Sequence, residues 1–236
     1  MSATTTRSRY PTLADVARRV GDVSLQRIRT YPLPGTATAN DLLDPAVTGD
    51  RLCELVGGVI VEKAMGWKEG GLGLWIGSLL NLYLMEHNIG YAAGADGMVR
   101  FNLDLVRLPD VSFIRWDSVD DPEAIENPGS AFLEVAPDLV VEVLSPGNTR
   151  REMAIKLGEY AKAGVRLVWY VDPERKEVDV YPKARAKGKV TVGVGGELDG
   201  GPVLPGFTLP VAKLFEKRAP AGRKGGKSPK GKPKKG

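Results

Sequence analysis

The sequence predicts a mixed α/β (α+β) domain in which one central sheet is flanked by helices and an N-terminal β-hairpin precedes the rest. Three observations support this fold class. The run at 138–145 is continuous and rich in β-branched residues, which is typical of a strand covered on both faces. Residues 151–164 repeat their apolar side chains with helical period. Patterns of helix and strand alternate along most of the remaining chain.

The first elements follow from local signals in the N-terminal half. Residues 12–20 carry apolar side chains at helical spacing and predict a short amphipathic helix. Residues 51–64 read as two short strands around Gly57 and Gly58, a good hairpin signal. The next apolar periodicity predicts a helix over 71–90 that ends at its final glycine.

The C-terminal half of the domain should alternate strands with one strong helix. The loop before the helix 151–164 offers Asn148 or Thr149 as the N-cap with Glu152 in the first turn, and Gly164 suits its end. Short strands and a final amphipathic segment are expected within 188–215. The other expected strands lie at 98–106, 110–116, 138–145, 165–174 and 176–183.

Charge divides the chain into unequal parts. The last twenty residues hold nine Lys or Arg and no acid, whereas the whole chain has a net charge of +4, so the remainder carries about −5. We therefore predict an N-terminal extension at 1–44, a globular domain at 45–215 and a disordered basic tail at 216–236. The tail (217–236) is either a solubilising or targeting segment or an arm that contacts phosphates.

Composition excludes several classes of protein and site. No segment approaches the length of apolar sequence that a membrane span needs, and the N-terminus lacks the apolar core of a signal peptide. A single cysteine, Cys53, cannot form an intramolecular disulfide, so the expected location is cytoplasmic. The lone His87 excludes a histidine-rich zinc site.

Acidic residues that interrupt apolar context are the candidates for chemistry. Asp110 opens one predicted strand, Glu142 lies inside another, and Glu69 precedes the predicted helix 71–90. Carboxylates of this kind can hold Mg²⁺, which prefers hard oxygen ligands and often binds phosphate as well. Lys156, on the next helix, could orient a water or neutralise charge on a phosphate.

A purely structural interpretation of the same residues is also open. Glu142 could be the buried ion-pair partner of Lys156, Arg150 or Arg151, and Asp110 could cap a turn at a strand start. Glu152 and Lys156 could form an ordinary pair on the helix surface. Spacing alone does not reveal which strands are neighbours, so the residue types leave both interpretations standing.

Three segments together resemble a known family. ELVGGVIVEKAMG, LPDVSFIRWD and PDLVVEVLSPGNTRREMAIKLGEYAKAGVRLVWYVDPE are similar to the Uma-two family of restriction endonucleases, a branch of the PD-(D/E)xK nuclease superfamily. The resemblance covers about residues 45–215. It implies a restriction-endonuclease-like core with a Mg²⁺ site, in which Mn²⁺ could substitute, and DNA as the substrate.

The resemblance also implies roles for individual residues. The aspartate of the PD motif falls on Asp110 and the glutamate of the second motif on Glu142. The usual lysine position, two residues later, is Leu144 here, and Lys156 on the following helix matches the family's displaced lysine. The helix-borne acid matches Glu69, so the implied metal ligands are Asp110, Glu142 and Glu69. Glu54, in the hairpin, is a further candidate near the site.

We therefore expect a metal-dependent endonuclease that hydrolyses phosphodiester bonds in DNA. The alternative is a catalytically inactive protein on the same fold that binds nucleic acid or another partner, because the common E-x-K spacing is absent. A different phosphoryl or small-molecule hydrolase is a third hypothesis. A homodimer would let two sites cut two strands.

Overall fold

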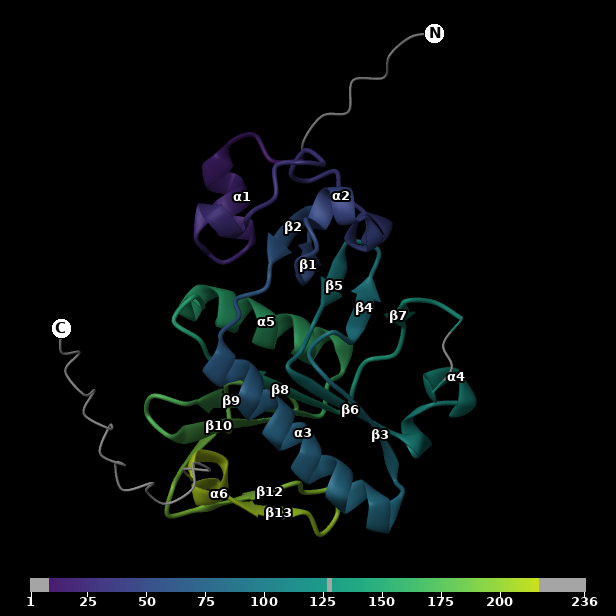
Figure 1. Cartoon of the computed structure of the whole chain (residues 1–236), viewed down its shortest axis with the longest axis vertical. Coiled ribbons are helices and arrows are strands. Elements are labelled where there is room, and N and C mark those ends of the chain that lie inside the picture. Colours follow the sequence, from purple (N-terminus) through teal and green to yellow (C-terminus); the bar gives the residue numbers. More distant parts are fainter. Residues whose placement is uncertain (1–8, 127–128, 217–236) are drawn as a thin grey trace, which may run out of the picture.

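The computed structural model describes residues 9–126 and 129–216, and its mixed α/β fold confirms the fold class that the sequence predicts (Figure 1). Two large sheets and a two-stranded hairpin contain the strands of this part of the chain. The expected central sheet is therefore joined by a second large sheet. The basic tail from residue 217, and with it the predicted phosphate contacts, lies outside the described residues.

The larger sheet has six strands, and the functional residues described below lie around its middle. Its order is β11-β10-β9-β8-β6-β3. Within this sheet only β8 and β9 run parallel. The connection between them contains the helix that the sequence predicts at 151–164. The strands are β3 (Gly90–Ala93), β6 (Val111–Arg115), β8 (Leu139–Val143), β9 (Leu167–Asp172), β10 (Glu177–Pro182) and β11 (Val190–Gly193).

The smaller sheet is built on the predicted hairpin. Its order is β2-β1-β5-β4-β7. Gly57 and Gly58 both have positive φ, at 61° and 74°, which suits the tight turn of a two-residue hairpin. The strands are β1 (Cys53–Val56), β2 (Val59–Glu62), β4 (Met98–Asn102), β5 (Leu105–Arg107) and β7 (Phe132–Leu133), and a separate hairpin joins β12 (Glu197–Asp199) to β13 (Thr208–Pro210).

Helices cover both faces of the six-stranded sheet. One long helix crosses one face, and a second helix lies between the two large sheets (Figure 1). The α-helices are α1 (Leu13–Arg19), α2 (Pro45–Thr48), α3 (Trp67–His87), α4 (Glu123–Glu126), α5 (Arg150–Ala163) and α6 (Val211–Phe215). Three 3-10 helices span Leu25–Arg27, Ala39–Leu43 and Trp116–Ser118.

Helix α5 has the boundaries that its sequence indicates. Thr149 is the N-cap, and its side chain and that of Glu152 form a capping box. Gly164 ends the helix in the left-handed region, with φ of 91°. The cap fixes where the helix starts and therefore which of its side chains face the sheet.

Two elements differ from the prediction. Helix α3 begins at Trp67 and not at residue 71, so Glu69 lies in its first turn and does not precede the helix. It ends at His87 with Asn88 in the left-handed conformation, because Gly90 already belongs to β3, where a Cβ would come within 2.1 Å of a backbone oxygen of Ile114. The single strand predicted at 98–106 is broken into β4 and β5. The Asn102 side chain accepts a hydrogen bond from the Asp104 backbone N–H at 3.0 Å, which makes a local turn.

The N-terminal segment packs onto the hairpin. Val16 of α1 and Val20, the C-cap of that helix, lie in one apolar cluster with Val56 and Val61 of the hairpin strands. Arg27 binds Glu152 at the start of α5, at 2.7 Å. Residues 9–44 contact the rest of the protein at further places as well, including ion pairs of Arg9 with Asp104 and of Asp22 with Arg151.

Candidate active site

The alternation of side chains along β8 explains why an apolar strand carries Glu142. Leu139, Val141 and Val143 face α3 and belong to the largest apolar cluster. Val140 and Glu142 point to the other face, toward α5. The Glu142 side chain is only 5% exposed there, so its carboxylate needs partners within the protein.

Lys156 supplies the opposite charge from α5. Its ammonium lies 3.1 and 3.2 Å from the two carboxylate oxygens of Glu142 and 2.9 Å from Glu54. Tyr160, one turn later on α5, donates its hydroxyl to Glu142 Oε1 at 2.5 Å. A lysine on the following helix thus reaches the glutamate, although Leu144 occupies the position that this lysine usually takes.

Glu54 connects the hairpin sheet to this cluster. Besides Lys156, it accepts hydrogen bonds from Arg107 at 2.7 Å and from the Leu108 backbone N–H at 3.2 Å. Arg107 in turn binds Glu159 of α5 at 2.6 Å. The hairpin acid that the sequence placed near the site is therefore part of a buried network shared by both sheets and α5.

Asp110 lies beside Glu142 at the start of β6. Strands β6 and β8 are antiparallel neighbours with Val111 opposite Val141, and Asp110 Oδ2 accepts the Val143 backbone N–H at 2.6 Å. Its other oxygen, Oδ1, lies 2.9 Å from the ammonium of Lys63. Asp110 is thus held from both sides, and its side chain remains 16% exposed.

Asp110 also lines a cavity of about 330 Å³. The glycine-rich face of α3 forms one wall and packs closely against Asp110, since a Cβ at Gly73 would lie 3.4 Å from the Asp110 Cβ. Glu142 and Lys156 do not line this cavity. The other lining residues include Gly70, Gly77, Ser78, Asn81, the 92–96 segment and Val111.

Glu69 is placed apart from the other predicted ligands. It lies in the first turn of α3 and folds toward Gly66, where an added Cβ would be 2.0 Å from its Oε2. Within residues 9–126 and 129–216, no three His, Cys, Asp or Glu side chains are grouped so that they could hold a metal ion. The structure brings Asp110, Glu142 and Lys156 together and does not add Glu69 to them.

The charges of the cluster act on one another strongly. Burial raises the pKa of Glu142 above 4.5, and the negative charges of Asp110 and Glu54 add to the rise, against the lowering by Lys156. Burial also acts to raise the pKa of Glu54, but the charges of Lys156 and Arg107 outweigh it and hold the pKa below 4.5. The pKa of Lys156 lies above 10.5 because Glu142 and Glu54 outweigh its burial.

Four residues of this charged cluster are not indicated by the sequence. Arg107, Tyr160, Glu159 and Lys63 all bind a carboxylate or cation of the cluster. Tyr160 could have been found, because it follows Lys156 by one helical turn and therefore shares its face. The other three contacts depend on how the hairpin sheet and α5 pack, which local sequence does not show.

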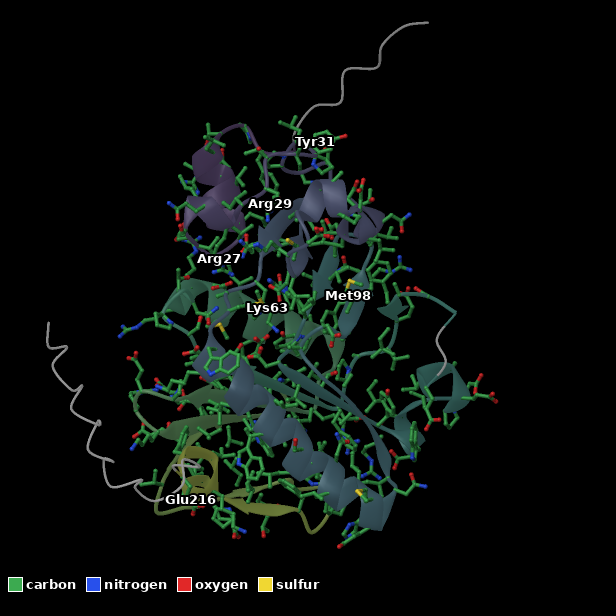
Figure 2. The ribbon with its side chains drawn as sticks, viewed as in Figure 1. Arg27, Arg29, Tyr31, Lys63, Met98 and Glu216 are labelled. Carbon is green, nitrogen blue, oxygen red and sulfur yellow. The ribbon has the colours of Figure 1, made fainter. Side chains whose placement is uncertain are left out.

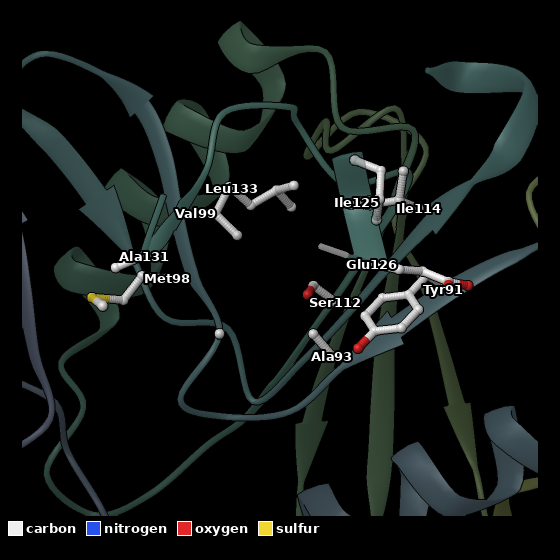
Figure 3. Close-up of a pocket in the computed structure, with 11 residues that line it drawn as sticks. Tyr91, Ala93, Met98, Val99, Ser112, Ile114, Ile125, Glu126, Ala131 and Leu133 are labelled. Carbon is white, nitrogen blue, oxygen red and sulfur yellow. The ribbon is translucent and has the colours of Figure 1, made fainter. Parts of the chain in front are cut away.

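A second cavity, of about 180 Å³, contains none of the predicted residues (Figure 3). Tyr91, Ser112, Ile114 and Leu133 are among the residues that surround it. It opens between the edge strand β3 of one sheet and β4 and β7 of the other. Its mainly apolar lining provides no acid and amine pair like that of Glu142 and Lys156.

None of the helices in the described part of the chain is both long and apolar enough to cross a membrane.

A search of curated proteins found no match. Among solved structures, the crystal structure of "a putative nuclease belonging to DUF820" from Anabaena variabilis has a TM-score of 0.60 to this chain. It is 21% identical and the match covers 70% of this chain and 90% of that one, which shows a shared fold.

The family comparison reaches further than the fold. The model of the Uma2 family, described as "Putative restriction endonuclease", matches residues 41–212. The match includes Glu54, Asp110, Glu142 and Lys156 and extends from the hairpin to α6. The chain therefore belongs to the Uma2 family.

Proposed function

We propose that this protein is a Mg²⁺-dependent endonuclease that hydrolyses phosphodiester bonds in DNA. The observation that carries the proposal is the meeting of Asp110 and Glu142, from adjacent strands, with the ammonium of Lys156 on Glu142. Membership of the Uma2 family supports a nuclease rather than another hydrolase. DNA as the substrate, Mg²⁺ as the cofactor and a cytoplasmic location are parts of this proposal.

Two acids of the cluster, Asp110 and Glu142, are the candidates to hold a divalent cation, since no three acidic side chains of the described residues are grouped as a metal site. Four carboxylates, from Glu54, Asp110, Glu142 and Glu159, face only three cations, from Lys63, Arg107 and Lys156. A carboxylate oxygen has two lone pairs, so an oxygen that already accepts one hydrogen bond can also bind a metal. Asp110 and Glu142 would hold the ion, and Mg²⁺ commonly binds through one or two carboxylates while it keeps several waters.

The residues around the metal ligands would have separate tasks. A bound Mg²⁺ supplies Lewis-acid chemistry and lowers the pKa of a coordinated water. Lys156 adds positive charge close to Glu142 and would position the attacking water. Tyr160 and the Val143 backbone N–H fix the orientation of Glu142 and Asp110, respectively. Glu69, at the start of α3, would support the site once substrate and metal are bound.

Cleavage of supercoiled plasmid DNA with Mg²⁺ or Mn²⁺ tests the proposal. We expect the wild-type protein to nick or linearise the plasmid, and Asp110→Asn, Glu142→Gln and Lys156→Met to reduce the rate roughly 100-fold or more. Glu62→Gln is the matched control, because Glu62 is also a hairpin acid but pairs with Arg29 and Arg51. Full cleavage by folded Asp110→Asn and Glu142→Gln proteins would reject the assignment.

One observation favours the alternative, a binding protein without catalysis. Both oxygens of Glu142 already have partners within the protein, and the Lys156 side chain is only 3% exposed. A buried cluster of this kind could hold the folded protein together without taking part in any reaction. Retarded DNA in a gel-shift assay, with no cleavage in Mg²⁺ or Mn²⁺, would support this second function. Sedimentation of the same protein would test the expected homodimer.

A further inference from the structure

Lys63 is a buried cation that the sequence did not single out. It follows β2 directly, and its backbone N–H donates to the Leu52 carbonyl at 2.8 Å. Its side chain is 6% exposed, and its ammonium lies 2.9 Å from Asp110 Oδ1. Figure 2 shows Lys63 below the hairpin, where the chain enters the region between the two large sheets.

The surroundings of Lys63 differ from those of Lys156. Lys156 is held by two glutamates at three short distances. Among the described residues Lys63 forms one ion pair, with Asp110, and a longer contact of 3.4 Å to the Ala95 carbonyl. Its charge also acts on Glu54 and Glu142, where it lowers the pKa of each carboxyl. Asp110 and Ala95 both line the cavity of about 330 Å³. Lys63 itself does not line the cavity, so its ammonium lies behind the wall that these partners form. With one ion pair against the two of Lys156, it is the more weakly held ammonium.

We propose that Lys63 is a built-in counter-ion that holds the cation position on Asp110 and is displaced when a divalent metal binds. The inference rests on the proposed function, because it assigns a regulatory residue to the same site. The Lys63 ammonium and a metal ion are both cations that bind the Asp110 carboxylate, so they compete for the same oxygen. The Val143 N–H bond to Oδ2 does not involve Lys63 and can keep the carboxylate oriented after exchange.

Competition has a measurable consequence. Removing the ammonium while keeping an apolar chain of similar length should tighten metal binding, because the metal no longer displaces a charge. Lys63→Met is this change. We expect it to bind Mn²⁺ roughly tenfold more tightly than wild type in isothermal titration calorimetry. The same titration with Mg²⁺ should shift in the same direction.

Two further variants serve as controls. Lys68→Met removes a lysine whose ammonium, within the described part of the chain, contacts a backbone carbonyl, that of Pro173 at 3.5 Å, and no carboxylate, so Mn²⁺ affinity should stay at the wild-type value. Lys63→Arg keeps the charge, so its affinity should also resemble wild type. If Lys63→Met does not fold, Lys63→Gln, which also removes the charge, takes its place, and an affinity no higher than that of Lys68→Met would contradict the proposal.

The outcomes separate this inference from the proposed function. Tighter Mn²⁺ binding by Lys63→Met supports the inference, and it does so even if no protein cleaves DNA, a result that would reject the nuclease alone. Unchanged or weaker binding by a folded Lys63→Met protein overturns the inference while wild-type cleavage keeps the function. Absence of metal binding by every variant overturns both.

Discussion

The two faces of the six-stranded sheet have different physical characters, and β8 contributes to both. Its residues Val141 and Val143 face α3 within a cluster of apolar side chains that includes Trp169. Glu142, between them in sequence, faces α5 and a network of charges. The comparison shows that every second residue of a strand can pack in the apolar core, while the residues between them face a charged cluster on the other side of the sheet.

The two faces should therefore respond differently to substitution and to pH. Burial of apolar area on the α3 face stabilises the fold in proportion to the area removed from water, whatever the pH. On the α5 face each buried charge depends on its partner, and loss of one partner leaves the other desolvated and unpaired. Substitutions on each face, and a change of pH, test this contrast.

Removal of the Lys156 charge should have the largest effect. Lys156→Met leaves the carboxylates of Glu54 and Glu142 buried without their shared cation, so we expect a loss of about 3–5 kcal/mol in the free energy of unfolding. Urea denaturation measures it. Adding Glu142→Gln should recover part of the loss, because the two sites are in contact.

The matched change on the other face is Leu80→Ala, in α3, which should lose about 3 kcal/mol through its cavity. Combining it with Glu142→Gln should give a simple sum of the two single effects. Coupling of Leu80 to Glu142 as strong as that of Lys156 would show that the faces are not independent.

Loss of a single hydroxyl should have an intermediate effect. Tyr160→Phe removes the donor at 2.5 Å from Glu142, and a hydrogen bond to a charged group contributes about 2 kcal/mol. Tyr170→Phe is the control, because its hydroxyl donates to a neutral acceptor, the Met153 carbonyl at 2.8 Å, and should contribute about 1 kcal/mol. Thermal denaturation compares them, and equal losses would argue against an ionised Glu142.

The smallest expected effect is the contribution of Glu54 to the pH dependence of the free energy of unfolding. The pKa of Glu54 lies below 4.5, so below pH 4.5 the unfolded chain binds a proton there that the folded protein does not. Its contribution is complete above pH 4.5 and is lost as the pH falls, by up to about 1.4 kcal/mol per pH unit. Urea denaturation from pH 5 to pH 3 should show a shallower slope in Glu54→Gln, and the wild-type slope in Leu80→Ala.

The sequence predicts best what is encoded locally. Thr149, Glu152 and Gly164 are signals within one helix, and the structure confirms the helix that they delimit. The division of residues 98–106 into two strands was missed, because the turn depends on one side-chain contact of Asn102. The second sheet was missed since its strands come from distant parts of the chain, as when Leu55 pairs with Val106.

The site was predicted in part for the same reason. The types of Asp110, Glu142 and Lys156, together with the family resemblance, indicated a cluster, and the structure brings these side chains together. Their roles as metal ligands and catalyst stay predictions. Lys63 gave no local signal, because it meets Asp110 only through the packing of the hairpin against the larger sheet.

The large sequence separation between Glu54 and Lys156 has a consequence for biosynthesis. The two residues are separated by 102 positions, and the cluster also requires Tyr160. A chain still emerging from the ribosome cannot assemble these groups until most of its length has been made. Whatever reaction the acids and the lysine support is therefore withheld from nascent fragments that end before Tyr160.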